Sequence, residues 1–414
     1  MTSAPRVVVT TNGPGELVGW ARPFLRAVYN RAPDADVTVV FVPCPYATGR
    51  EAAHAKQMFP RANVVDPKAY ARYLFRKPVA GMHRGFGALQ YLGGDLFHAT
   101  TLAKRLGMAA LTYKFSRRDY RSSFQRFYAL DEENARKLRG DGAPPERVRI
   151  VGNLVPDSVL GALQQPLNPP GVGEGVCILP GSRPAEIKHL MQYYLAIAKG
   201  LIEARPGLPV TFVVSPFTSD EQLATALARE PDPLYGGMRG IVADGGTAIV
   251  GDGVRVALDR SGNYGVLSRA GLIVTIPGTK CLEAAVLGRP MLVIVPLNRP
   301  DEVAMNGLGA YLHHVPIVGR PLKRWLVRSV ERRFRFVAQP NIDVDRMLAQ
   351  ELRGVLMPSD VVAKAVDMLD RPDELRAMGE TLSKVYASHV GAADRMAADA
   401  LAIAASAASP SGAA

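Results

Sequence analysis

Two short segments of the chain end an apolar run in proline and glycine, continue with a hydroxyl and a cation, and then begin a helical pattern. The first is ILPGSRPAEIK, residues 178–188, and the second is TIPGTKCLEAA, residues 275–285. A glycine turn after a strand lets the next helix present its free N–H groups and its dipole to an anion. The pattern therefore predicts that both segments bind phosphate or diphosphate.

The two turns carry matching polar groups: a hydroxyl donor, a cation, and a glutamate inside the first helical turn. The residues are Gly181, Ser182, Arg183 and Glu186 in the first turn, and Gly278, Thr279, Lys280 and Glu283 in the second. Each glutamate either caps its helix or accepts hydrogen bonds from ribose hydroxyls, and the sequence leaves both interpretations open. Because GxxxxGK[ST] is absent, we expect no ATPase chemistry.

A third glycine turn, NGPGELVGW, begins at residue 12 and places Gly13, Gly15 and Glu16 after the first strand pattern. The glycines allow a close approach to the backbone. The segment is not GxGxxG, and no acidic residue is clearly placed for the ribose of NAD. We therefore expect no dinucleotide cofactor, and no cofactor of any other kind.

A fourth glycine turn, LGGDLFHATTLAKRLG at residues 92–107, places Asp95 at a helix start with His98 three residues further on. Aspartate is common at this position because it caps the helix. A carboxylate beyond the end of a central strand can also take a proton from an acceptor hydroxyl. Asp95 is accordingly the candidate catalytic base.

Strand patterns alternate with helical patterns along the whole chain, and these elements must position the turns. The strand patterns cover 6–11, 36–43, 87–95, 108–113, 126–130, 147–152, 176–183, 209–217, 254–258, 271–278 and 290–297. Such alternation predicts an α/β fold with parallel sheets and helices on both faces. Ligands of such sheets bind beyond the carboxyl ends of the strands.

The chain is too long for one ordinary core, so we expect two doubly wound, Rossmann-like domains facing a cleft. A stretch rich in proline and glycine marks the boundary, and a long helical pattern at about 359–407 closes the chain. The expected divisions are an N-terminal Rossmann-like domain at 1–164, a linker at 165–175, a second Rossmann-like domain at 176–385, a C-terminal helix packing back on the first domain at 386–405, and a disordered tail at 406–414.

The net charge of +12 suits an anionic partner. Cations gather at 114–126 and at 319–335. In the second run, apolar residues recur at helical spacing around Trp325, beside the arginine stripe Arg324, Arg328 and Arg332. A basic amphipathic helix is typical of a segment on an anionic membrane surface. The alternative is a helix packed on its own domain. No nucleic-acid motif is present, so we expect no nucleic-acid partner.

Further sequence features indicate a cytoplasmic protein. The N-terminus lacks the pattern of a signal peptide, and no window is long and apolar enough to cross a membrane. The three cysteines show no CxxC spacing, which favours a reducing compartment. His313 and His314 have no partner at a spacing typical of metal ligands, so we expect no metal site.

The chain resembles lipid-A-disaccharide synthase, an inverting glycosyltransferase of the GT-B type. The resemblance covers most of the length and rests on NGPGELVGWARPFLRAV, GGDLFHATTLAKRLG, VGNLVPD, LPGSRPAEI, IPGTKCLEAAVLGRPMLV and the late RWLVRSVERRFRFVAQPNI with AQEL. It implies a UDP-sugar donor bound by the C-terminal half. It also implies a lipid-linked sugar acceptor reaching the N-terminal half, with the enzyme peripheral on the inner face of the cytoplasmic membrane.

The resemblance assigns roles position by position. Asp95 becomes the base and Arg183 a diphosphate contact, and the donor site is lined by Gly278, Thr279 and Glu283. The late motifs add Asn341 and Glu351 near the same site. Inverting transfer needs no metal ion where cations and helix N-termini stabilise the departing UDP.

The chain departs from this family at several positions. Pro277 replaces a serine, Lys280 replaces a small residue, and Asn153 replaces a histidine. A cationic segment also follows the aspartate motif, and about 25 extra residues lie within 296–324. Two alternatives therefore stay open, a UDP-sugar 2-epimerase with the same fold and a non-catalytic scaffold. The sequence also leaves a homodimer open.

Overall fold

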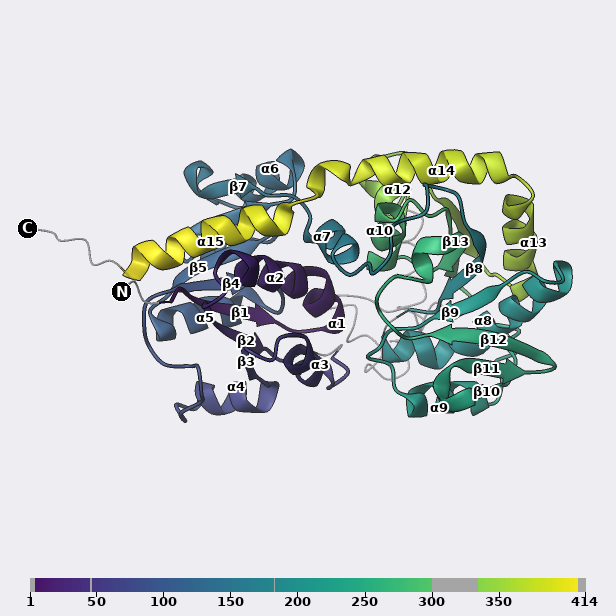
Figure 1. Ribbon diagram of the computed structural model, residues 1–414, viewed down its shortest axis with the longest axis horizontal. Coiled ribbons are helices and arrows are strands. Elements are labelled where there is room, and N and C mark those ends of the chain that lie inside the picture. The colour runs from purple at the N-terminus through teal and green to yellow at the C-terminus, as the bar shows by residue number, and fades with distance from the viewer. Residues whose placement is uncertain (1–3, 45–46, 182, 300–333, 409–414) are drawn as a thin grey trace, which may run out of the picture. The chain divides into compact units, whose positions relative to one another are not determined.

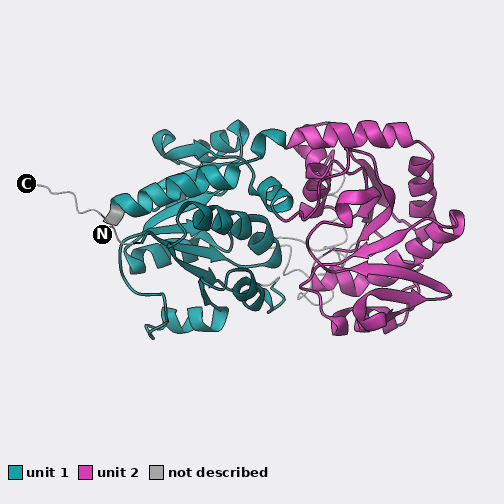
Figure 2. Cartoon of the chain, viewed as in Figure 1, with its two compact units in different colours: residues 1–161, 387–414 teal, residues 162–386 magenta. Residues whose placement is uncertain are grey.

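The computed structural model describes residues 4–44, 47–181, 183–299 and 334–408. The chain divides into two compact units (Figure 2). Unit 1 comprises residues 1–161 and 387–414, and unit 2 comprises residues 162–386. In the described part of the chain, no helix is both long enough and apolar enough to span a bilayer.

Unit 1 is built on a parallel sheet. Its described strands are β1 (Arg6–Thr11), β2 (Asp36–Phe41), β3 (Asn63–Val65), β4 (Ala88–Tyr91), β5 (Ala109–Tyr113), β6 (Arg126–Ala129) and β7 (Val148–Ile150). They lie in the order β3-β2-β1-β4-β5-β6-β7. Valine-rich β1 is buried along its whole length, as expected for a central strand covered on both faces.

Helices cover both faces of this sheet (Figure 1). The described helices of unit 1 are α1 (Pro14–Glu16), a π-helical turn (Leu17–Ala21), α2 (Arg22–Arg31), α3 (Glu51–Met58), α4 (Pro67–Leu74), α5 (Leu96–Leu106), α6 (Glu132–Gly140), α7 (Leu154–Leu160) and α15 (Ala392–Ala408), with short 3₁₀ turns at Arg118–Tyr120, Pro145–Arg147 and Ala387–His389. Helix α15 packs on α2 and α7 and on the central strands. Its ion pairs Arg31–Asp394 and Arg126–Asp399 fasten it there.

Unit 2 contains the second sheet. Its described strands are β8 (Glu174–Leu179), β9 (Val210–Val213), β10 (Ile241–Ala243), β11 (Ala248–Gly251), β12 (Val254–Asp259), β13 (Ala270–Thr275), β14 (Met291–Pro296) and β15 (Gln350–Gly354). The order is β10-β11-β12-β9-β8-β13-β14-β15. The pairings β10–β11 and β11–β12 are antiparallel, and the other pairings are parallel.

The helices of unit 2 bury a large apolar core against this sheet. They are α8 (Pro184–Ala204), α9 (Asp220–Ala228), α10 (Thr279–Val286), α12 (Gln339–Asp343), α13 (Pro358–Leu369) and α14 (Pro372–Val385), with 3₁₀ turns at Asp244–Gly246 and Leu267–Arg269. Helix α8 supplies much of that core, from Ile187 to Leu201. The predicted α/β architecture with two Rossmann-like sheets is confirmed.

Several details differ from the sequence prediction. Four strands were not predicted, β3, β10, β11 and β15. The first two are only three residues long, and β15 has the polar sequence QELRG. The single helical pattern at 359–407 is divided into α13, α14 and α15. Pro372 begins α14, and Gly391 stands before α15 with a φ of +85°. Proline cannot extend a preceding helix, and a left-handed residue ends one.

The segment expected as a linker, 165–175, is held against unit 2 by a buried arginine. The guanidinium of Arg289 donates to the carbonyl oxygens of Asn168, Pro169 and Val172 and to that of Leu287. Burial lowers the pKa of Arg289 to about 10. The four carbonyl acceptors satisfy a cation that has no exposed surface.

Candidate functional site

The two proline–glycine turns follow neighbouring strands. Strands β8 and β13 are parallel partners, and Leu179 pairs with Thr275 at their carboxyl ends. The chain goes from β8 to β9 on one side, and β13 lies on the other side. The order in which the chain adds strands therefore reverses between β8 and β13. Open α/β sheets bind their ligands at this position.

The first turn is closed by its own glutamate. Glu186 Oε2 accepts a hydrogen bond from the Arg183 N–H at 3.0 Å, and the Arg183 guanidinium lies 3.6 Å from the same carboxylate. Gly181 has a φ of +102°, and a Cβ there would lie 2.3 Å from Glu186. Only glycine fits this turn. Ser182 lies outside the described residues.

The second turn presents an open helix N-terminus. Gly278 has a φ of +153° and is exposed, and a Cβ at this position would meet no atom within 4 Å. Thr279 is exposed beside it. The ammonium of Lys280 lies 2.7 Å from the carboxylate of Glu283, whose side chain is only 6% exposed, and 5.7 Å from the centre of the Tyr264 ring. A cation and an accessible helix N-terminus thus meet at one turn.

A tyrosine that the sequence did not single out lies beneath the turns. Tyr194 on α8 is fully buried, and its hydroxyl has no hydrogen-bond partner among the described residues. Burial raises its pKa, and the nearby Tyr193, Glu186 and Cys281 add to the increase. In the sequence it is one of several aromatic residues expected in an apolar core, and no motif distinguishes it.

Asn341 and Glu351 are engaged within unit 2. Glu351 Oε1 accepts from the N–H groups of Val337 and Ala338, each at 2.9 Å, and from the Asn341 amide at 2.8 Å. Its other oxygen pairs with Arg353. The Asn341 side chain also bonds both N–H and C=O groups of residues 348–349. These two late-motif residues hold α12 against β15.

Replacing Glu351 with alanine is expected to destabilise the protein by about 3–5 kcal/mol, because it removes the carboxylate that the partly buried Arg353 and two N–H groups share. Chemical denaturation measures the loss. The matched control is Glu203→Ala, which removes the exposed carboxylate that pairs with Lys199 on α8 and should change stability by less than about 0.5 kcal/mol. Equal effects of both variants would contradict the prediction.

Acid should weaken the same network. Burial alone would raise the pKa of Glu351, but hydrogen bonds from the Ala338 N–H, Arg353, the Val337 N–H and Asn341 outweigh burial and lower it below the ordinary value of 4.5. A lowered folded-state pKa contributes stability above the unfolded-state value and loses it as pH falls through the folded-state value. Glu351→Gln should therefore flatten the dependence of stability on pH below about 4.5, as measured by denaturation at a series of pH values.

The glycine turns of unit 1 also meet where the strand order of its sheet reverses. Strands β1 and β4 are parallel neighbours, while the chain first goes from β1 to β2 on the other side. Gly13, Gly15 and Glu16 follow β1, and Asp95 follows β4. A Cβ on Gly93 would lie 3.0 Å from Glu16, so the two turns are in contact. Topology thereby brings together the acceptor-side residues predicted from separate motifs.

Asp95 caps α5 and stays accessible. Its carboxylate accepts from the Phe97 N–H at 2.8 Å, and the residue is exposed. His98 lies 2.7 Å from the hydroxyl of Tyr70 through Nδ1. Burial lowers the pKa of His98, which the Asp95 charge partly opposes, and burial raises the pKa of Tyr70 to about 12. The lowered pKa favours the neutral imidazole of His98, so the turn offers two candidate proton acceptors, this ring and the exposed carboxylate of Asp95.

The cationic segment at 114–126 follows β5 at the same edge of the sheet. Lys114 lies 5.6 Å above the Phe115 ring, and Phe115 contacts Trp20 of the π-helical turn at 6.2 Å. A π-helical turn is often found at functional sites. The structure thus adds Trp20 and Phe115 to the surroundings of the candidate acceptor site.

The predicted membrane-surface residues Trp325, Arg324, Arg328 and Arg332 lie outside the described residues, as do His313 and His314. Among the residues that are described, no group of three or more histidine, cysteine, aspartate or glutamate side chains is arranged to hold a metal ion.

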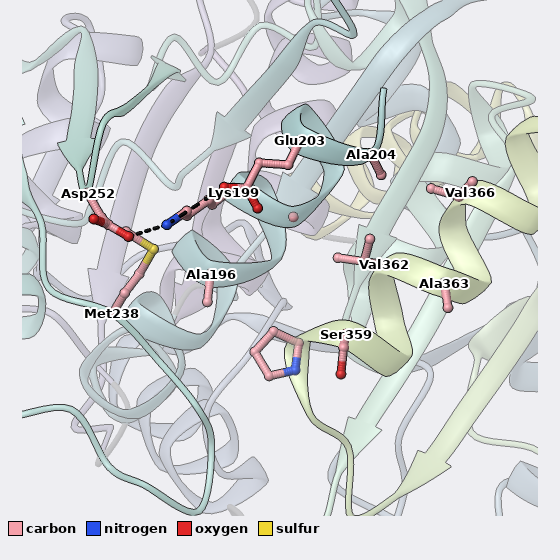
Figure 3. A pocket seen from close by; sticks show the side chains of 12 residues that line it. Ala196, Lys199, Glu203, Ala204, Met238, Asp252, Ser359, Val362, Ala363 and Val366 are labelled. Carbon is pink, nitrogen blue, oxygen red and sulfur yellow. Dashed lines mark hydrogen bonds and ion pairs between the residues drawn. The ribbon is translucent and has the colours of Figure 1, made fainter. Parts of the chain in front are cut away.

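A cavity of about 570 Å³ lies elsewhere in unit 2, between the second half of α8 and the first half of α13 (Figure 3). Ala196 and Ala204 face Val362 and Val366 across it, and Lys199 on its rim pairs with Asp252. The turn at Arg183 is at the opposite end of α8. The cavity is therefore separate from the candidate site, which was located from the strand order.

Comparison with known proteins yields relatives by sequence. The chain is 27% identical to the lipid-A-disaccharide synthase of Cellvibrio japonicus over 274 residues, which are 65% of this chain and 59% of that protein. It is 27% identical to that of Pseudomonas aeruginosa over 249 residues, 58% of this chain and 53% of that protein. The chain thus matches about half the length of these curated relatives. No family model matches.

Solved structures share the fold. The UDP-GlcNAc 2-epimerase of Neisseria meningitidis bound to UDP-GlcNAc superimposes with a TM-score of 0.52 at 14% identity, covering 96% of this chain and 99% of that one. S. aureus MnaA in a co-structure with UDP gives 0.56 at 12% identity, covering 95% of each chain. At this identity the likeness shows the fold alone, and the fold is of the GT-B type.

Proposed function

We propose that the protein is a glycosyltransferase that moves a sugar from a UDP-sugar to a lipid-linked acceptor with inversion at the anomeric carbon. The observation that carries the proposal is the pair of turns on β8 and β13. Their helix N-termini, Arg183 and Lys280 lie at adjacent strand ends where the sheet changes direction. This arrangement suits the two phosphates of a nucleotide sugar.

The donor half of the reaction follows from the chemistry of these turns. Gly278 and Thr279 present N–H and hydroxyl donors to a phosphate, and Lys280 and Arg183 balance the negative charge that develops on the departing UDP. Preorganised donors of this kind stabilise a leaving group without a metal ion. Glu283 lies three residues beyond Lys280, where it can accept hydrogen bonds from the ribose hydroxyls.

The acceptor half is assigned to Asp95 in unit 1. The acceptor hydroxyl attacks the anomeric carbon from the face opposite UDP, the bond from that carbon to the diphosphate oxygen breaks, and the hydroxyl proton passes to the Asp95 carboxylate. One displacement inverts the anomeric centre. The exposed carboxylate of Asp95 is available for this proton transfer.

A lipid-linked acceptor is supported by the names of the relatives, which act in lipid A synthesis by their printed name, and by the net charge of +12. A basic protein associates with an anionic bilayer. We therefore place the enzyme as a peripheral protein on the inner face of the cytoplasmic membrane.

The test is release of UDP from a panel of UDP-sugars in the presence of extracted membrane lipids, with mass spectrometry of the lipid products. The proposal expects one UDP-sugar to yield both UDP and a glycosylated lipid. Absence of UDP binding, together with absence of a lipid product for every donor, would reject it.

A second candidate is a UDP-sugar 2-epimerase, because two solved structures of the same fold carry a 2-epimerase name or bound UDP. Such an enzyme needs no acceptor. Incubation of each UDP-sugar without lipid, followed by analysis of the sugar, separates the two: an epimerised nucleotide sugar would favour this candidate, and an unchanged donor would favour transfer.

A further inference from the structure

Exposed cations and aromatic rings gather at the amino edge of the unit 1 sheet. None of the candidate site residues predicted from the sequence lies there. Helices α4 and α5 both begin at the carboxyl edge of the sheet and end at its amino edge, where a loop at residues 75–86 leads into β4. We call this region the α4–α5 end surface. Its members are Arg72, Phe75, Arg76, Lys77, Arg84, Phe86, Lys104 and Arg105.

Contacts between these segments show that they form one surface. Arg105 at the end of α5 donates to the carbonyl oxygen of Leu74 at 3.0 Å, which places the end of α5 beside the end of α4. Arg84 lies near Gly107, where a Cβ would be 3.4 Å from its Nε atom. The Gly85 N–H also donates to the Leu106 carbonyl oxygen at 2.8 Å.

The loop is tied to the sheet. Buried Arg6 on β1 donates to the carbonyl oxygens of Gly81 and His83, at 2.8 and 2.9 Å. The Asn63 amide donates to the carbonyl oxygen of Ala80 at 2.7 Å. The loop is therefore anchored from beneath, while Phe75 and Phe86 remain 81% and 63% exposed.

Within residues 67–107 the charge at this surface is of one sign, while nearby Asp36 at the start of β2 pairs with Arg6 at 3.5 Å. Residues 67–107 contain Lys68, the six cations of the α4–α5 end surface and a single acid, Asp95. Asp95 is at the opposite end of α5, about 16 Å away for an 11-residue helix. No carboxylate in this part of the sequence therefore offsets the cations.

We propose that the α4–α5 end surface is where the protein contacts an anionic lipid bilayer, with Phe75 and Phe86 entering the headgroup region and the cations binding lipid phosphates. Aromatic rings flanked by lysine and arginine are the composition of interfacial membrane anchors. An acidic protein would use the cations but would not require two exposed rings on an anchored loop. The inference rests on the proposed function for its biological reason, while the binding itself needs no catalysis.

The experiment is sedimentation of the full chain with vesicles of phosphatidylcholine alone or with about one third phosphatidylglycerol. Binding is expected only with the anionic lipid and should weaken at high salt. Arg72→Gln with Arg76→Gln should lower the partition coefficient about 25-fold, since each cation near such a surface contributes roughly fivefold. Phe75→Ser with Phe86→Ser should lower it by roughly tenfold, because the rings lose their apolar contact with the lipid.

Two matched controls keep the result specific. Arg136→Gln with Lys137→Gln removes two exposed cations from α6 of the same unit, and Ile241→Ser removes an exposed apolar side chain from unit 2. Both should bind vesicles as the unaltered protein does. Circular dichroism of every variant confirms that it is folded.

The inference is overturned if the two double variants at the α4–α5 end surface sediment normally, or if the α6 control loses binding to the same extent. It is also overturned if Trp325→Ser abolishes binding while Phe75→Ser with Phe86→Ser keeps it. Binding of UDP to the same variants distinguishes this outcome from failure of the proposed function: intact UDP binding with unchanged sedimentation rejects only the membrane surface.

Discussion

Replacing Asp95 with asparagine is expected to lower the rate of sugar transfer by about 10²–10⁴-fold, the contribution of a general base. Asparagine keeps the shape of the side chain and cannot take the proton of the acceptor hydroxyl. The measurement is UDP release and lipid product at saturating donor and acceptor. The affinity for UDP should stay within about twofold, because Asp95 belongs to unit 1 and the phosphate turns belong to unit 2.

The choice of asparagine separates catalysis from stability. Asp95 caps α5 through the Phe97 N–H, and asparagine caps as well as aspartate does. Alanine would in addition remove the cap, at about 1 kcal/mol of stability. The proposal expects Asp95→Asn and Asp95→Ala to lose transfer equally while only the alanine variant melts earlier. If Asp95→Asn transfers sugar at the normal rate, Asp95 is a cap and the base lies elsewhere.

Removing both turn cations, by Arg183→Ala with Lys280→Ala, is expected to weaken UDP binding at least about 100-fold. A hydrogen bond from a charged donor contributes roughly 1.5–3 kcal/mol, so each cation accounts for about tenfold or more. Isothermal titration calorimetry with UDP measures the effect. Each single variant should show part of the loss.

The matched control for this pair is Lys188→Ala, an exposed cation on the same helix as Arg183 and one turn beyond it. It should bind UDP normally. Glu283 is almost fully buried beside Lys280, so the thermal stability of the Lys280 variant is measured as well. If UDP binding is unchanged in a folded double variant, the two turns do not form a diphosphate site, and the proposed function loses its central observation.

Much of the fold was accessible from the sequence because its signals are local. Each buried central strand, such as β1 or β13, is a short apolar run bounded by turn residues. The strands that escaped prediction lack this signal: β15 is polar because Glu351 and Arg353 act as its internal ion pair. A pattern of hydrophobicity cannot reveal a strand whose burial depends on paired charges.

The candidate site was predictable to a similar degree. Glycine, hydroxyl, cation and glutamate at short spacing marked both turns as candidate phosphate sites, since backbone geometry and helix N-termini depend on neighbours in the chain. The same reasoning could not separate a cap from a ligand. The structure shows Glu186 bonded to its own helix start and Glu283 paired with Lys280.

By itself, the sequence determined the α/β class, the turns and the residue types in them, because each depends on contacts over a few residues. Only the tertiary structure decided that the turn after β8 lies beside the turn after β13, and that the turn after β1 touches the turn after β4. It also brought Tyr194 close to both proline–glycine turns, Tyr70 to His98, and the ends of α4 and α5 into one cationic surface. Strand order joins residues far apart in the chain, and it is set by the burial of whole helices and sheets rather than by any short pattern.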